Sequence, residues 1–98
     1  MKKVIKNEDS PLVPLSAVNN DNIYAAYSVN HGHAVIIQYD GEEYYTNWVY
    51  SGRMYDLYYA TEDLSTLIID LMERGLEVFE FENEEDFAKW LIENYNKT

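Results

Sequence analysis

The sequence predicts an α+β fold, in which a four-stranded antiparallel meander is followed by a helix, a short strand and a second helix. Apolar residues alternate with a period of two between residues 23 and 59, and they recur at a helical spacing from Leu64 onward. The 98 residues match the size of one domain. We expect residues 16–98 to form that single α+β domain. Residues 1–15, which contain both prolines, are expected to form a flexible or docked N-terminal tail.

The meander is expected to contain strands at residues 23–29, 33–39, 42–50 and 53–59. Two-residue turns are predicted at Asp40-Gly41 and Ser51-Gly52, because these residues tolerate the positive φ of tight hairpins. For the first hairpin we expect a three-residue loop with Gly32 in the left-handed conformation. That loop pairs Tyr27 with Val35 and Ala25 with Ile37, and it collects the apolar residues, Ala25 included, on the sheet face toward the helices.

Two amphipathic helices are predicted in the second half of the chain. The first has Thr61 as its N-cap and Gly75 as its stop, and its apolar stripe consists of Leu64, Leu67, Ile68, Leu71 and Met72. A short strand follows at residues 76–81. Asn83 then caps the second helix, whose apolar side contains Phe87, Trp90, Leu91 and Tyr95. We expect both helices to pack on the same face of the sheet.

Composition excludes several classes of function. With 18 acidic and 7 basic residues the formal charge is −11, so direct binding to nucleic-acid phosphates or to an anionic membrane is disfavoured. The absence of cysteine excludes disulfides, thiolate metal sites and cysteine catalysis. His31 and His33 are interpreted as a turn residue and a strand residue, since a zinc site needs three or four ligands. No nucleotide-binding or hydrolase motif is present, so we expect no enzymatic activity, cofactor or metal.

A binding surface is predicted from the tyrosines and the carboxylates. Six of the ten tyrosines lie between Tyr44 and Tyr59. The expected register leaves one sheet face, which includes Ile36 and Val49, without a helix over it. Exposed tyrosines next to acidic and amide side chains are typical of protein interfaces, although cross-strand tyrosine pairs also stabilise a solvated sheet. The predicted partner-binding residues are Tyr24, Glu43, Tyr45, Asn47, Asp56, Tyr58, Glu80, Glu82, Glu84 and Glu85.

The short, cysteine-free chain, its tyrosine-rich meander and its acidic segment at residues 77–87 resemble small acidic accessory proteins of bacteriophages and mobile elements, of the anti-CRISPR and anti-restriction kind. The resemblance implies that acidic side chains stand in for DNA phosphates and block a basic channel. It also implies a location in the cytoplasm of a bacterial host cell.

The sequence therefore predicts a non-enzymatic inhibitor or binding protein that engages a basic surface of a nucleic-acid-processing protein. The alternative is a homo-oligomeric structural domain, such as a homodimer, or a small-ligand-binding domain, in either case using the tyrosine-rich sheet face.

Overall fold

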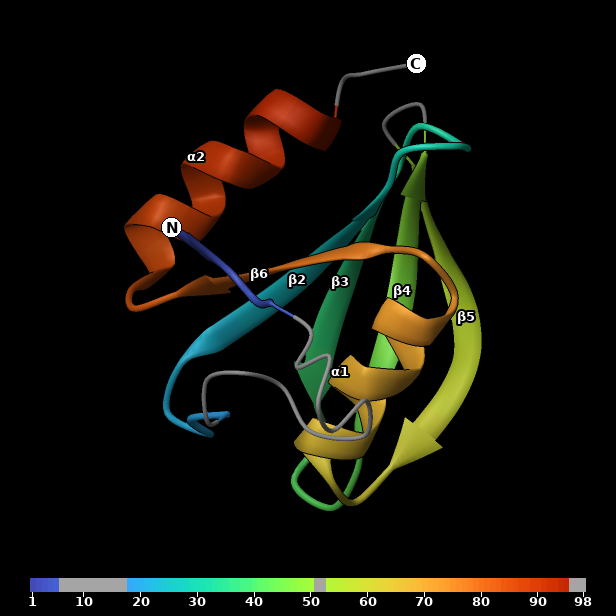
Figure 1. The fold of residues 1–98 in the computed structure, drawn as a ribbon, viewed down its shortest axis with the longest axis vertical. Helices are drawn as coiled ribbons and strands as arrows, with labels where there is room; N and C mark the ends of the chain where they lie inside the picture. Colours follow the sequence, from blue (N-terminus) through green and yellow to red (C-terminus); the bar gives the residue numbers. More distant parts are fainter. Residues whose placement is uncertain (6–17, 51–52, 96–98) are drawn as a thin grey trace.

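One antiparallel sheet and two helices form the fold of the computed structural model, which describes residues 1–5, 18–50 and 53–95 (Figure 1). The sheet order is β1-β6-β2-β3-β4-β5. This arrangement confirms the α+β class and the meander β2 to β5, while β1 lies within the predicted tail. The elements are β1 (Lys2–Lys3), β2 (Ile23–Ser28), β3 (His33–Tyr39), β4 (Tyr44–Tyr50), β5 (Arg53–Thr61), α1 (Leu64–Glu73), β6 (Glu77–Phe81) and α2 (Glu84–Tyr95).

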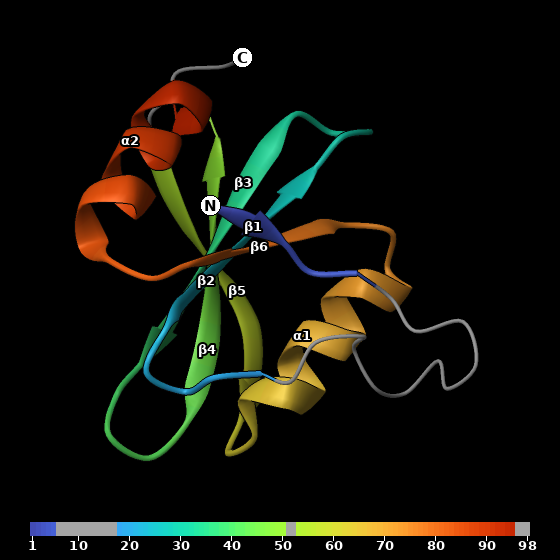
Figure 2. The ribbon, with the colours of Figure 1, turned by 60° about the vertical axis from the view of Figure 1, so that its left-hand side comes forward.

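The two helices lie on opposite faces of the sheet, as Figure 2 shows. On one face Leu67 of α1 is buried against sheet residues that include Val78 of β6. On the other face Trp90 of α2 is buried with Phe81, which is also in β6. The expectation that both helices share one face is wrong. Because β6 is covered on both sides, its alternating residues enter two separate apolar layers.

The register of the first hairpin explains this difference. Tyr27 pairs with Ala34 and Ser28 with His33, so four residues, 29–32, connect β2 to β3 instead of the expected three. A one-residue change of register exchanges the two faces of a strand. Tyr24 therefore lies on the α1 face, where we expected Ala25. Gly32 does adopt the predicted left-handed conformation, with φ of 72°.

The second hairpin also has a longer loop than expected, but its faces are preserved. Tyr39 pairs with Tyr44, so residues 40–43 form the turn. The Asp40 carboxylate closes this turn by accepting hydrogen bonds from the backbone N–H groups of Glu42 (2.9 Å) and Glu43 (2.8 Å). The register differs from the expected one by two residues. A shift of two residues returns each side chain to the same face.

The pairing of β4 with β5 follows the prediction along part of its length. Trp48 pairs with Tyr55 and Thr46 with Leu57, as expected. A bulge between Tyr45 and Thr46 then shifts the register, so that Tyr44 pairs with Thr61 rather than Tyr59. The predicted turn at residues 51–52 lies outside the described residues.

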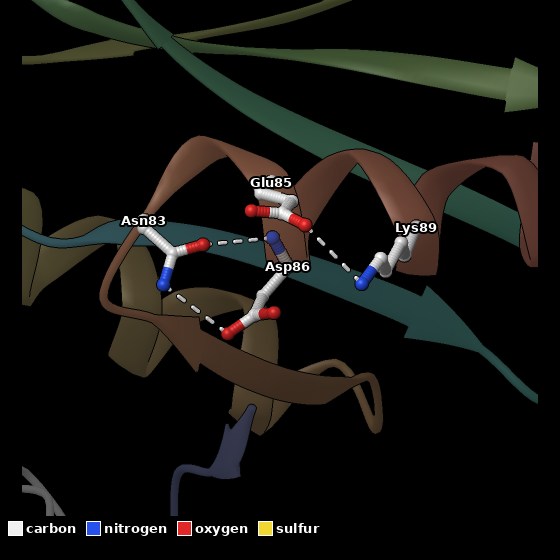
Figure 3. A network of polar contacts seen from close by, with 4 residues as sticks. All are labelled: Asn83, Glu85, Asp86 and Lys89. Carbon is white, nitrogen blue, oxygen red and sulfur yellow. Dashed lines mark hydrogen bonds and ion pairs between the residues drawn. The ribbon is translucent and has the colours of Figure 1, made fainter.

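Capping residues define the ends of the helices. Asp63, not Thr61, is the N-cap of α1, and its Oδ1 accepts a hydrogen bond of 3.2 Å from the Ser65 N–H. Gly75 follows this helix with φ of 86°, as predicted for its stop. Asn83 caps α2 as predicted: its Oδ1 accepts a 2.8 Å hydrogen bond from the Asp86 N–H (Figure 3).

The predicted tail is docked at its beginning. Lys2 and Lys3 pair with β6, and the Val4 N–H donates a 2.8 Å hydrogen bond to the Val78 carbonyl oxygen. The Val4 side chain is buried in the α1 layer. Residues 6–15 of the predicted tail lie outside the described residues.

Candidate functional site

An exposed acidic surface lies where β6 ends and α2 begins. Glu82, Glu84 and Glu85 are exposed, and all three were predicted as partner-binding residues. Glu84 and Glu85 occupy the first turn of α2, where carboxylates are stabilised by the positive end of the helix dipole. Glu85 forms an ion pair of 3.4 Å with Lys89 one turn later (Figure 3). We name Glu82, Glu84 and Glu85 the acidic turn.

The outer side of α2 continues from the acidic turn. Ile92 is a large apolar side chain on this helix that is 65% exposed. Glu85, Lys89 and Ile92 are spaced four and three residues apart, so they share one side of the helix. Ile92 was not among the predicted partner-binding residues, because helical spacing alone does not show which apolar residues remain outside the core.

Glu80 does not belong to the acidic turn. It pairs with Tyr24 across β6 and β2, and the Tyr24 hydroxyl donates a hydrogen bond to Glu80 Oε2. The same hydroxyl accepts a hydrogen bond of 2.9 Å from the Asn19 N–H. Burial, followed by the hydrogen bond to Glu80, raises the pKa of Tyr24 to about 12. Tyr24 is only 3% exposed, so its predicted place on an uncovered face is wrong.

The tyrosine-rich face is less open than expected. Helix α2 covers part of it and buries Ile36 and Val49, which were both expected on the uncovered side. Asn47 is 4% exposed, and its amide Nδ2 donates a hydrogen bond to Gln38 Oε1. Asn47 therefore contributes to the interior rather than to an exposed surface.

Four predicted residues lie in β4, in β5 and in the turn before β4. Tyr45 and Glu43 are half-buried, and the backbone of Asp56 pairs with Asn47. The side chains of Asp56 and Tyr58 lie outside the described part of the chain. Two strands separate β4 from β6, so at a strand spacing of about 4.8 Å the Tyr45 backbone lies roughly 14 Å from β6. The predicted residues thus form two separate groups, one at the acidic turn and one at β4 and β5, rather than one patch.

A pocket of about 270 Å³ opens on the α1 side of the sheet, away from both groups. We call it the His–Trp pocket. Its lining comes from the β2–β3 hairpin, β4, the end of α1 and the residues that follow this helix. The lining residues are Ser28, His31, His33, Val35, Trp48, Leu71, Arg74 and Leu76.

Stacked rings form one wall of the His–Trp pocket. The ring centroids of His33 and Trp48 are 3.7 Å apart, and those of His31 and His33 are 5.4 Å apart. The Ser28 hydroxyl lies 2.9 Å from His31 Nδ1. Burial, and then the neighbouring His31, lower the pKa of His33 below its usual value, so the neutral ring is favoured. His31 and His33 occupy a turn and a strand, as predicted, but the sequence did not indicate their contact with Trp48.

Two further polar groups belong to residues that line this pocket. The Trp48 indole N–H is buried and has no hydrogen-bond acceptor among the described residues. Arg74 reaches the pocket from the end of α1, and its Nε forms a 2.9 Å ion pair with Asp70. Ser28, Trp48 and Arg74 come from three segments that are far apart in the chain, so no sequence motif indicates this site.

Neither the described side chains nor comparisons with known proteins assign this chain to a known class. No group of three or more histidines and carboxylates within the described ranges is arranged to hold a metal ion. None of the helices in the described segments has the length and apolar character needed to cross a membrane. The chain matches no protein-family model, no curated protein and no solved structure.

Proposed function

We propose that this chain is a non-enzymatic binding protein whose acidic turn engages a basic surface of a nucleic-acid-processing protein. The observation that carries the proposal is the exposed, largely uncompensated charge of this turn. Among the residues that the structure describes, Glu82 and Glu84 form no ion pair, and the exposed Lys89 is the one ion-pair partner of Glu85. These carboxylates are therefore accessible to an external cation.

The charge of the whole chain supports the same function. A formal charge of −11 produces a long-range field that attracts basic surfaces and accelerates association with them. Such a field also repels nucleic acid, which competes for the same basic groove. Occupation of the groove by carboxylates would inhibit the partner without any chemical step.

Ile92 supplies an apolar contact next to these charges. Charged rims contribute mainly to association rate and salt dependence, whereas desolvated apolar side chains near the centre of an interface contribute most of the affinity. Ile92 lies two helical turns beyond Glu85 and is exposed. We therefore place the centre of the proposed interface on the outer side of α2. Tyr45, in β4, lies outside this interface.

A displacement assay tests this function. The chain is titrated into complexes of fluorescent duplex DNA with a panel of basic nucleic-acid enzymes, at several salt concentrations. We expect release of DNA from at least one enzyme, and we expect the inhibition constant to weaken as salt increases. Release that does not depend on salt, or no release from any enzyme, would contradict the proposal.

Two triple variants with the same change of charge locate the surface. Glu82→Gln/Glu84→Gln/Glu85→Gln neutralises the acidic turn and should weaken inhibition by about tenfold or more. The control neutralises three exposed carboxylates elsewhere and should weaken inhibition by less than about threefold. Equal losses in both variants would show that only net charge matters. The control variant is Glu42→Gln/Glu62→Gln/Glu73→Gln.

A further inference from the structure

We propose that His33 is an acid-sensitive latch of the His–Trp pocket. Its neutral ring covers Trp48 at neutral pH, and the charged ring leaves the pocket in mild acid, between about pH 6.5 and 5. This latch lies on the α1 side of the sheet and is separate from the acidic turn. It does not depend on the function proposed above.

The place of His33 in the sheet allows it to move without the rest of the fold. His33 is the first residue of β3, and it pairs with Ser28, the last residue of β2. The loop beyond this pair is open to solvent: Val29 is 62% exposed, and His31 is exposed as well. The last pair of a ladder opens at a lower free energy than pairs in its centre. Departure of His33 therefore leaves the central pairing of β2 and β3 in place.

The side chain of His33 covers part of the Trp48 ring. His33 is 8% exposed, and the centroids of the two rings lie 3.7 Å apart. Trp48 itself is half-buried, and it lines the same pocket as the buried Val35 and Leu71. When His33 leaves, the covered part of the indole becomes accessible to solvent and to small neutral molecules. The accessibility of Trp48 therefore reports whether the latch is closed.

The charges around His33 favour its neutral form in the closed pocket. Burial, and then His31 at a centroid distance of 5.4 Å, lower the pKa of His33. The end of α1 contributes Arg74, whose Nε is paired with Asp70, and β4 contributes Trp48, which does not titrate. None of the described lining residues carries a carboxylate. A ring outside the pocket titrates near its ordinary pKa of about 6.5, so the closed state loses its advantage as the pH falls below this value.

Quenching of tryptophan fluorescence by acrylamide, a neutral molecule, tests the latch. The chain has two tryptophans, so a Trp90→Phe variant reports Trp48 alone. We expect the quenching constant of Trp48 to rise at least about twofold between about pH 7.5 and 5, with a midpoint below about 6.5. In ¹⁵N spectra of the parent chain, the Trp48 indole resonance should shift over the same interval. The Trp90 indole, which lies in the other apolar layer, should not shift.

Histidine variants in the Trp90→Phe chain assign the transition to His33. His33→Phe keeps an aromatic ring beside Trp48 that cannot be charged, so the quenching constant should not change with pH. His31→Asn removes the neighbouring charge, so the transition should remain and its midpoint should move to higher pH. The chain has two histidines, so the variant that combines both changes is the control for any titration of carboxylates.

The parent chain also gives a reading that requires no variant to fold. The imidazole resonances of His33 should titrate with a midpoint below about 6.5. The proposal is overturned by a midpoint at or above this value, by a quenching constant of Trp48 that does not rise, or by an equal rise in His33→Phe. It is also overturned if Trp48 and Trp90 respond together, because the whole fold would then be opening.

Discussion

The hydroxyl of Tyr24 provides a sharp test of the buried polar contact between β2 and β6. Tyr24→Phe removes this hydroxyl and leaves the ring, so it deletes the hydrogen bond to Glu80 and the one from the Asn19 N–H. A hydrogen bond to a charged acceptor contributes about 1.5–3 kcal/mol, and a neutral one contributes about 1 kcal/mol. Since the half-buried Glu80 regains some hydration, we expect the variant to lower the free energy of unfolding by about 1–3 kcal/mol at neutral pH.

The pH dependence of this difference follows from the raised pKa. The pKa of Tyr24 rises from 10.0 to about 12 in the folded chain, so the folded state holds this proton more tightly than the unfolded state. The resulting stability is fully present below pH 10 and is lost as the pH rises from 10 to about 12. A shift of two full units would represent about 3 kcal/mol, and the loss should be smaller than this because Glu80, the hydrogen-bond partner, is itself partly solvated. Tyr24→Phe lacks this loss, so its deficit should shrink over the same interval.

Urea unfolding followed by circular dichroism measures both effects. The parent chain, Tyr24→Phe and a control, Tyr39→Phe, are compared at neutral pH and at several values between about 9 and 12. Tyr39 is 55% exposed, and its hydroxyl donates a solvent-exposed hydrogen bond of 2.9 Å to the Gly41 carbonyl oxygen, so loss of the hydroxyl should change stability by less than about 0.5 kcal/mol. If Tyr24→Phe is as stable as the control at neutral pH, or if its deficit stays constant up to pH 12, the reasoning about this buried hydroxyl is wrong.

Three further predictions concern the two layers, the second helix and the buried imidazole. Leu67→Ala and Phe81→Ala remove fully buried side chains from opposite faces of the sheet, so each should cost about 2–5 kcal/mol in urea unfolding; a cost below 1 kcal/mol for either would show that its face is uncovered. Asn83→Ala should lower stability by about 1 kcal/mol through loss of the α2 cap, whereas Asn83→Ser should retain most of it in thermal melts. Because the pKa of His33 is lowered by burial, stability should decrease as the pH falls below about 6.5, and His33→Phe should reduce this slope in melts between about pH 7.5 and 5.

The sequence alone determined the features that depend on neighbouring residues. The order of the elements from β2 to α2 follows from apolar periodicity. Asn83 marks a helix start because its side chain accepts a hydrogen bond from a free backbone N–H, and Gly75 marks a helix end because it adopts a positive φ. The exposure of Glu82, Glu84 and Glu85 was also predictable, because carboxylates gather at helix N-termini. The His–Trp pocket was not predictable, since Trp48 and Arg74 are far apart in the chain.

Only the tertiary structure decided which side chains face which helix. Residues 23–27 of β2 are apolar or aromatic at every position, so alternation does not mark one side of this strand as the buried side. The register is decided by β6, which pairs with β2 and places Val78 in one layer and Phe81 in the other. These contacts join segments about 50 residues apart in the chain. A central strand buried on both faces carries no polar pattern of its own, so its orientation depends on the elements that pack around it.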